Sequence, residues 1–186
     1  MSSLSLYSVQ AILILDGQGE RVFSKYYVPP GGHSDSIFEN LKKQRSFEKE
    51  LFEKTHKQDS EILLFEDHLV LYKEYIDVTL YLIGSLEENE IVLQQVFSAF
   101  KGSLDLILNS GIDKKNIQEH YDMVLLAIDE IVDNGVILET DPSTIAARVS
   151  KPPKNDTQLN LDLDKGIMGA WGFARSKLQE RFQQGL

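Results

Sequence analysis

The most regular hydrophobic pattern lies near the middle of the chain, where apolar residues recur every three or four positions. Its members are Ile91, Val92, Val96, Phe97, Phe100, Leu104, Ile107 and Leu108. This spacing places them on one face of a helix. Ser85 and Glu88 stand before the pattern at the spacing of a capping box, and a turn-forming segment begins at Asn109. We therefore predict a long helix that begins near Ser85 and ends near Asn109.

A second helical pattern belongs to an acidic segment, residues 121–141. Its apolar positions are Val124, Leu125, Ile128, Ile131 and Val132. Ile117 begins the same stripe and Asp113 is suited to an N-cap, so the pattern predicts one long helix from Asp113 onward. We interpret Gly135 as the residue that ends this helix, because a left-handed backbone is easy for glycine.

The residues after Gly135 predict an extended link and then another helix. Residues 136–138 are apolar and carry no helical spacing. Asp141 followed by Pro142 is a typical helix start, with aspartate at the N-cap and proline at the first helical position. A short helix is expected over residues 143–149.

Five shorter apolar segments predict strands. Residues 6–15 and 21–28 flank a glycine-containing turn and predict a hairpin, while residues 62–65, 69–75 and 78–83 predict an antiparallel meander. We expect at least one of the meander tyrosines to lie in the core; these tyrosines are Tyr72, Tyr75 and Tyr81.

One helix is expected between the hairpin and the meander. Ser36 and Glu39 stand at capping-box spacing after a proline-glycine break, and the apolar pattern runs to about His56. The predicted order is therefore ββαβββαα plus a short helix. It indicates an α/β fold of the α+β kind, in which helices flank a five-stranded, antiparallel-type mixed sheet.

The composition changes after Val149, which divides the chain into a domain of residues 1–149 and a tail. Residues 150–166 form a polar linker that contains prolines, and residues 167–186 predict an amphipathic helix with a basic face. The candidate anchors of this helix are Trp171, Phe173, Leu178 and Phe182. Docking on a partner, binding to an anionic membrane and folding back onto the domain all fit this pattern.

Charge and cysteine content narrow the function. The 186 residues carry 29 Asp plus Glu against 19 Lys plus Arg, a net charge of −10, which argues against broad nucleic-acid binding. The chain has no cysteine, and its apolar runs are far shorter than a membrane span. We expect a cytoplasmic protein.

No residue pattern predicts a catalytic, cofactor or metal site. Gly17 and Gly19 begin a dinucleotide fingerprint, but Val22 replaces its third glycine, so a hairpin turn is the better interpretation. The four histidines are scattered along the chain, without the spacing of metal ligands. Asp129 and Glu130 are adjacent and therefore point to different sides of a helix, which argues against an acid–base pair.

Several segments together resemble the zeta subunits of coatomer, which belong to the adaptor complex small subunit family. These segments are residues 6–16, 19–21, 25–27, 47–49, 54–56, 59–62, 88–90, 126–133 and 135–139. They occur in family order between about Leu6 and Val149. In the tail, residues 162–166 and 169–174 are similar to the fungal type.

The resemblance implies a longin domain and a non-enzymatic subunit of the COPI vesicle coat, without cofactors. It implies a heterodimer with the gamma-type large subunit, contact with the remaining coatomer subunits, and an indirect link to an Arf-type GTPase. The expected location is cytoplasmic and peripheral, on the cytosolic face of Golgi membranes and COPI vesicles. The expected role is Golgi-to-ER retrograde and intra-Golgi transport.

The resemblance also marks the residues of the acidic segment as family signature and candidate interface. They are Tyr121, Asp129, Glu130, Asp133, Gly135, Ile137 and Glu139. Two alternatives stay open, a peripheral membrane-binding module and a longin-type regulatory module, either acting through the basic C-terminal helix. A hydrolase is the weakest hypothesis, because no nucleophile is paired with a base.

Overall fold

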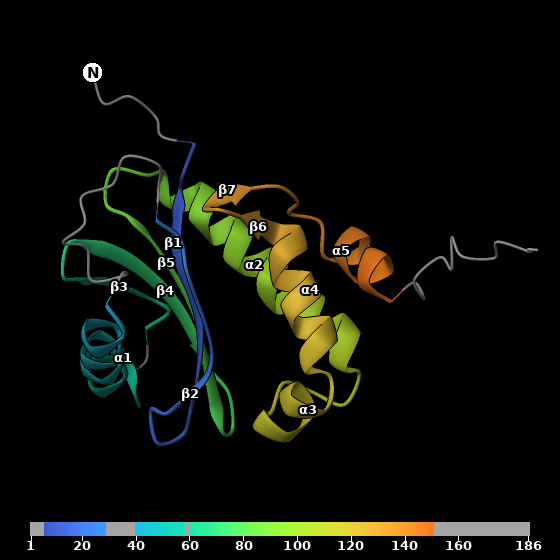
Figure 1. Ribbon diagram of the computed structural model, residues 1–186, viewed down its shortest axis with the longest axis horizontal. Coiled ribbons are helices and arrows are strands. Elements are labelled where there is room, and N and C mark those ends of the chain that lie inside the picture. The colour runs from blue at the N-terminus through green and yellow to red at the C-terminus, as the bar shows by residue number, and fades with distance from the viewer. Residues whose placement is uncertain (1–5, 29–39, 59, 151–186) are drawn as a thin grey trace, which may run out of the picture. The chain divides into compact units, whose positions relative to one another are not determined.

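A five-stranded sheet forms the centre of the molecule (Figure 1). The computed structural model describes residues 6–28, 40–58 and 60–150. The strand order is β2-β1-β5-β4-β3, and every neighbouring pair is antiparallel. The strands are β1 Val9–Asp16, β2 Arg21–Tyr26, β3 Ile62–Phe65, β4 His68–Glu74 and β5 Val78–Ser85. The predicted hairpin and meander are confirmed, and the pairing of β1 with β5 joins them into one sheet.

Helices cover both faces of the sheet (Figure 1). Of the described helices, α1 covers one face, and α2 and α4 cover the other, with α5 packed outside these two helices. The helices are α1 Leu41–Thr55, α2 Glu90–Leu108, α3 Lys114–Glu119, α4 Tyr121–Ile131 and α5 Pro142–Val149. A two-stranded hairpin of β6, Val132–Asp133, and β7, Val136–Ile137, lies between α4 and α5.

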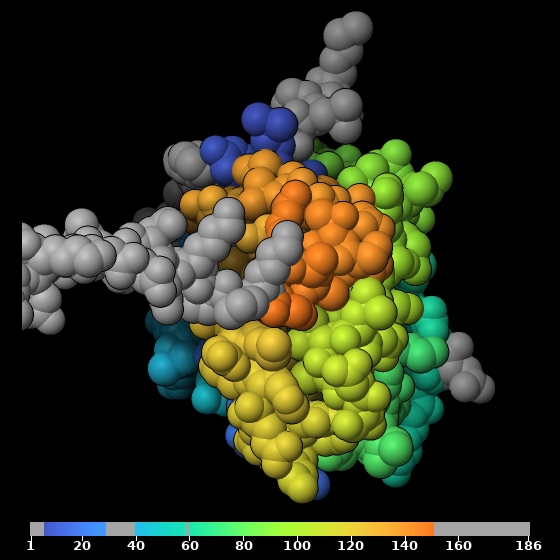
Figure 2. Space-filling view, turned by 90° about the vertical axis from the view of Figure 1, so that its right-hand side faces the viewer, coloured from blue at the N-terminus to red at the C-terminus, as the bar shows by residue number. Residues whose placement is uncertain are grey.

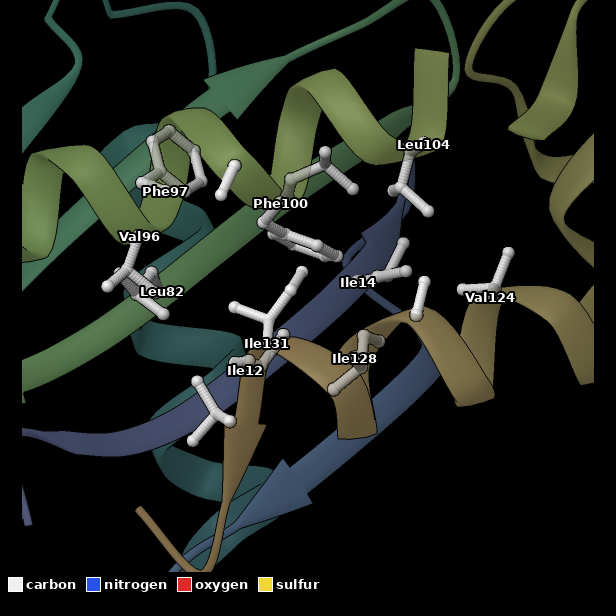
Figure 3. Packing of buried hydrophobic residues seen from close by; sticks show 14 of the residues in the cluster. Ile12, Ile14, Leu82, Val96, Phe97, Phe100, Leu104, Val124, Ile128 and Ile131 are labelled. Atoms are coloured by element: carbon white, nitrogen blue, oxygen red, sulfur yellow. The ribbon is translucent and has the colours of Figure 1, made fainter. Parts of the chain in front are cut away.

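Alternate residues of β1 fill two cores. Ile12 and Ile14 face the helical layer of α2 and α4, where Figure 3 shows them beside Phe100 and Ile128. Leu13 and its neighbours on the opposite face pack under α1. A strand buried on both faces explains why this segment is apolar at nearly every position.

The predicted α2 stripe is correct in its middle and wrong at its start. Val96 to Leu108 supply the expected buried positions, but Ile91 and Val92 are 78% and 38% exposed. Asn89 caps the helix, because its side-chain oxygen accepts a hydrogen bond from the backbone N–H of Ile91 at 2.9 Å. Ser85 instead ends β5, which leaves the capping-box interpretation incorrect.

Two other helix boundaries differ from the prediction. Asn40 is the N-cap of α1, so the helix begins after the predicted start. Ser36 and Glu39 lie outside the described residues. The second long helix is broken at His120, whose backbone leaves the helical region at φ −117 and ψ 32, and this break separates α3 from α4. Asp113 caps α3 as predicted, accepting from the N–H of Asn116.

The core assignments of the meander are confirmed. Tyr72 and Tyr81 are 2% and 0% exposed and stack with ring centroids 6.0 Å apart. Among the described helices, α2 alone is long and apolar enough to span a membrane, and half of that window is buried inside the fold. We interpret α2 as the core helix of a globular domain, since its apolar stripe packs on the sheet.

The chain divides into two units after Ser150. The predicted boundary at Val149 stays a prediction, as do the linker of residues 150–166 and the helix of residues 167–186. The candidate anchors Trp171, Phe173, Leu178 and Phe182 lie outside the described residues.

Candidate functional site

Gly135 has a different role from the predicted one. The helix α4 ends at Ile131, with Val132 as its C-cap. Asn134 and Gly135 then form the turn between β6 and β7, and both have positive φ, 48° and 85°. An Asn-Gly pair with positive φ at both positions is the preferred two-residue hairpin turn. Gly135 is therefore a hairpin residue and not the residue that ends the helix.

This hairpin is fastened to the main sheet at β1. The carbonyl oxygen of Gly135 accepts a hydrogen bond from the backbone N–H of Val9 at 3.1 Å. A Cβ atom at position 135 would lie 2.7 Å from the carbonyl oxygen of Val9, a distance that no side chain tolerates. Next to it, the Tyr27 hydroxyl donates a hydrogen bond to the carbonyl oxygen of Val132. Burial raises the pKa of Tyr27, and the negative charges of Asp129 and Asp133 raise it further.

Three of the four acidic signature residues form ion pairs within the domain. Lys25 of β2 pairs with Asp129 of α4. Arg148 of α5 binds Glu130 at 3.0 Å and Glu139 at 3.4 Å. These ion pairs tie three elements to one another, so the carboxylates position structure and do not form an acid–base pair.

The start of α5 is held by the residues that the sequence indicated. The Asp141 carboxylate accepts from the backbone N–H of Thr144 at 2.8 Å and from the Ser143 hydroxyl at 2.9 Å. Hydrogen bonds to Thr144 and then to Ser143 lower the pKa of Asp141. Glu139 holds the link before the helix, since its Oε1 accepts from the N–H groups of residues 140 and 141. The motif from Tyr121 to Asp141 is therefore a structural joint.

The joint leaves an apolar surface on α4, which we call the α4 patch: Tyr121, Leu125 and Leu126. Their exposed fractions are 42%, 38% and 52%. Tyr121 makes an edge contact with Phe23, with ring centroids 6.3 Å apart. Figure 2 views the face of the molecule on which α4, α5 and α2 lie side by side. Leu125 was predicted to be a core residue and is instead part of this surface.

The other signature residues are divided between surface and packing. Asp133 is exposed at the hairpin, and Ile137 is half-buried and packs against the core of α2 and α4. Leu126 was absent from the predicted buried stripe, but it was not predicted as part of a surface patch either. Its signal was present, because two adjacent leucines cannot both lie on the narrow stripe that Val124 and Ile128 define.

The hairpin ends of the sheet form a polar corner beside a cavity of about 440 Å³. Asp16 lines this cavity, and its carboxylate accepts from Lys114 Nζ at 2.7 Å and from two backbone N–H groups at 2.9 Å. Burial alone would raise the pKa of Asp16, but these donors outweigh it and hold the pKa below its ordinary value. Within the described part of the chain no group of His, Asp and Glu is arranged to hold a metal ion.

Comparison with known proteins identifies the family. The profile of the clathrin adaptor complex small chain matches residues 8–156. The coatomer zeta subunit of Saccharomyces cerevisiae is 73% identical over the full length of both chains. Human coatomer zeta-1 is 46% identical, with 78% of each chain covered. The probable coatomer zeta-A of Dictyostelium discoideum is 42% identical over 90% of this chain and 91% of its own.

A structural comparison gives the same fold. A chain in the structure titled "Homology model of the full-length AP-3 complex in a stretched open conformation" matches with a TM-score of 0.59. The match covers 87% of this chain and 98% of that one at 18% identity, so it supports the architecture alone. The α+β sheet, the profile over residues 8–156 and the full-length identity agree, and the chain belongs to the clathrin adaptor complex small chain family, as one of its coatomer zeta subunits.

Proposed function

We propose that this chain acts in the COPI coat by pairing with the gamma-type large subunit. The relatives that it matches over most of their length are coatomer subunits, which makes it a structural coat component and not an enzyme. Pairing with one particular large subunit is our inference from the resemblance. The work of such a subunit is the burial of surface against its partner.

The observation that carries the proposal is the α4 patch. Tyr121, Leu125 and Leu126 expose apolar surface side by side along one helix, although four buried residues of the same helix already pack on the core. Aromatic and aliphatic anchors of this kind usually lie at the centre of a protein interface. A stable interface buries about 800 Å² or more on each partner, so neighbouring residues must contribute as well.

Acidic residues around the patch favour a basic partner surface. Asp122 and Asp133 are exposed close to it in the sequence, while Asp129 and Glu130 are held by Lys25 and Arg148. Opposite charge across an interface mainly speeds association and selects the partner. We therefore infer that the large subunit presents apolar pockets with lysine or arginine residues around them.

The location follows from the partner. We infer that the pair joins the remaining coatomer subunits and that the coat is recruited by an Arf-type GTPase to the cytosolic face of Golgi membranes. Golgi-to-ER retrograde and intra-Golgi transport are the processes that this assembly serves. The support is the identity to coatomer zeta subunits.

Co-expression with a gamma-type large subunit tests the proposal. We expect the full chain to co-purify with the large subunit, and the double variant Leu125→Asp, Leu126→Asp to lose most of the complex. The control is Leu64→Asp, because Leu64 is equally apolar and 66% exposed but lies on the edge strand β3.

Two measurements separate a lost interface from a lost fold. The thermal unfolding of the free double variant should match that of the wild-type chain, since both leucines are partly exposed. If the wild-type chain does not co-purify with the large subunit, the pairing is wrong. If the double variant co-purifies as well as Leu64→Asp does, the pairing stands and the α4 patch is the wrong surface.

A further inference from the structure

The segment that contains α1 is basic, whereas the rest of the described domain is acidic. Residues 40–58, which include α1, carry six Lys or Arg and three Glu, a net charge of +3. The other described residues, 6–28 and 60–150, carry seven Lys or Arg and nineteen Asp or Glu, a net charge of −12. Of the helices that the structure describes, Figure 1 shows α1 on one face of the sheet and α2, α4 and α5 on the other.

The cations of α1 lie on its outward side. Lys42, Arg45 and Lys49 follow one another at intervals of three and four residues, so they form one stripe along the helix. All three are exposed, whereas Phe47 and Leu51 on the opposite side of the helix are buried against the sheet. We call these three residues the α1 stripe.

The α1 stripe is less neutralised than the cations on the other described elements. Elsewhere, Lys25, Lys73, Lys114, Lys115 and Arg148 each form an ion pair with a carboxylate, and Lys101 lies over the ring of Phe97. Within the part of the chain that the structure describes, Lys42 and Lys49 form no ion pair. Arg45 has one distant partner, Glu20 at 3.9 Å, and both of these side chains are at least half exposed.

The surface around the stripe lacks the apolar anchors of a protein interface. Among the described residues of α1, Leu41 at its first position is the one large exposed apolar side chain. Stable protein interfaces have an apolar or aromatic centre with charges at the rim. A surface of flexible, unpaired lysines and an arginine instead suits a diffuse layer of negative charge, such as phosphorylated lipid headgroups.

We propose that the α1 stripe is an electrostatic contact for the anionic surface of a lipid bilayer. The overall charge of −10 does not prevent this contact, because the Debye length at physiological salt is about 8 Å. Helix α4, which carries three carboxylates and no Lys or Arg, lies on the other face of the sheet, and its charges are largely screened from a membrane beneath α1. This contact is independent of the α4 patch and leaves that patch accessible to a protein partner.

Vesicle co-sedimentation of the full chain tests the proposal. The probes are vesicles of phosphatidylcholine alone and vesicles with about one third phosphatidylserine, whose surface attracts basic residues. We expect binding to the anionic vesicles only, and a decrease in binding as salt is raised. The double variant Lys42→Gln, Lys49→Gln should lower the partition coefficient on the order of 30-fold, from the usual contribution of two basic residues.

Two matched variants locate the contact. The double variant Lys73→Gln, Lys115→Gln lowers the net charge by the same amount, but its two lysines already have carboxylate partners. It should therefore change vesicle binding far less than Lys42→Gln, Lys49→Gln does. Trp171→Ala, Phe182→Ala tests the basic C-terminal segment and should leave most of the binding intact.

Three results would overturn the proposal. The first is no binding of the wild-type chain to anionic vesicles. If the chain then binds an immobilised acidic polypeptide instead, the basic stripe serves a protein partner and the lipid contact is wrong. The second is equal loss in the two lysine double variants, which would indicate an effect of net charge. The third is binding that disappears with Trp171→Ala, Phe182→Ala and persists in Lys42→Gln, Lys49→Gln.

Discussion

Gly135 combines two constraints, a left-handed backbone and a close approach to another strand. Its φ is +85° and an added Cβ would meet the carbonyl oxygen of Val9 at 2.7 Å. Gly111 provides the comparison, because its φ is +104° and an added Cβ would meet nothing within 4 Å. We expect Gly111→Ala to lower the free energy of unfolding by about 1–2 kcal/mol, from backbone strain alone.

Gly135→Ala should cost clearly more than this, because the hairpin must also move away from β1. Urea titrations of both variants, followed by circular dichroism, measure the difference. Equal losses in the two variants would show that backbone strain accounts for the whole effect and that the hairpin adapts at its contact with β1.

Asp16 should make the domain sensitive to acid. Its pKa is held below the ordinary value by Lys114 and by the N–H groups of residues 18 and 20, which outweigh the opposing effect of burial. A carboxylate with a lowered pKa stabilises the fold above its unfolded pKa, and this contribution is lost as the pH falls through the folded pKa. Stability should therefore fall below about pH 4, the region of the ordinary aspartate value.

The variant Asp16→Asn tests this dependence. It should be less stable than the wild type at pH 7, and the gap should narrow as the pH is lowered from about 5 to 2. Thermal unfolding at several pH values measures it. A gap that stays constant with pH would show that the Lys114 pair adds nothing to stability.

Single residues were predictable where their role is local. Asp113 and Asp141 were identified as N-caps, since a cap needs only its own side chain and the next three residues. Gly135 was misassigned because helix ends and hairpin turns both favour glycine with positive φ. Asn134 was the distinguishing signal, because an Asn-Gly pair points to the hairpin.

At the level of elements, a buried ion pair adds to the apolar packing that attaches α1 to the sheet. Glu48 is 2% exposed and accepts from Arg21 Nε at 3.0 Å and from the Tyr26 hydroxyl at 2.7 Å. Glu48→Ala would leave the Arg21 guanidinium without its carboxylate partner, although the Gln44 amide oxygen remains at 3.2 Å, so we expect a loss of about 3 kcal/mol. Glu50 on the same helix is exposed, and Glu50→Ala should change stability by less than about 1 kcal/mol.

Denaturant unfolding of the two glutamate variants distinguishes these expectations. Hydrogen exchange shows in addition whether the amides of α1 open before those of the sheet. A loss from Glu48→Ala that is no larger than the loss from Glu50→Ala would mean that Phe47 and Leu51 hold the helix without the ion pair.

The order of the elements was predictable because each strand and helix carries its own hydrophobic period. The break between α3 and α4 was not predictable from the hydrophobic pattern. Ile117 and Val124 are seven residues apart, a spacing that fits one continuous helix and gives no sign of the turn at His120. Leu125, like Ile91, fits a stripe by its spacing but is exposed in the structure. Periodicity shows which residues share a face and does not show how much of that face is covered.

At the scale of the whole molecule, the folded unit extends at least through α5. The last described helix, α5, belongs to the core: Ile145 is fully buried, Pro142 packs closely on Gly102, and Arg148 holds two carboxylates. Residues 1–149 should therefore fold without the remainder of the chain.

Two truncations test this boundary. A chain of residues 1–149 should unfold cooperatively, with the same midpoint in urea as the full chain. A chain of residues 1–139 lacks α5 and should lose at least about 2–5 kcal/mol, because removing Ile145 alone empties a fully buried site. A lower midpoint for residues 1–149 would move the boundary into the C-terminal segment, whereas an unchanged midpoint for residues 1–139 would make α5 dispensable for folding and leave it available for a partner.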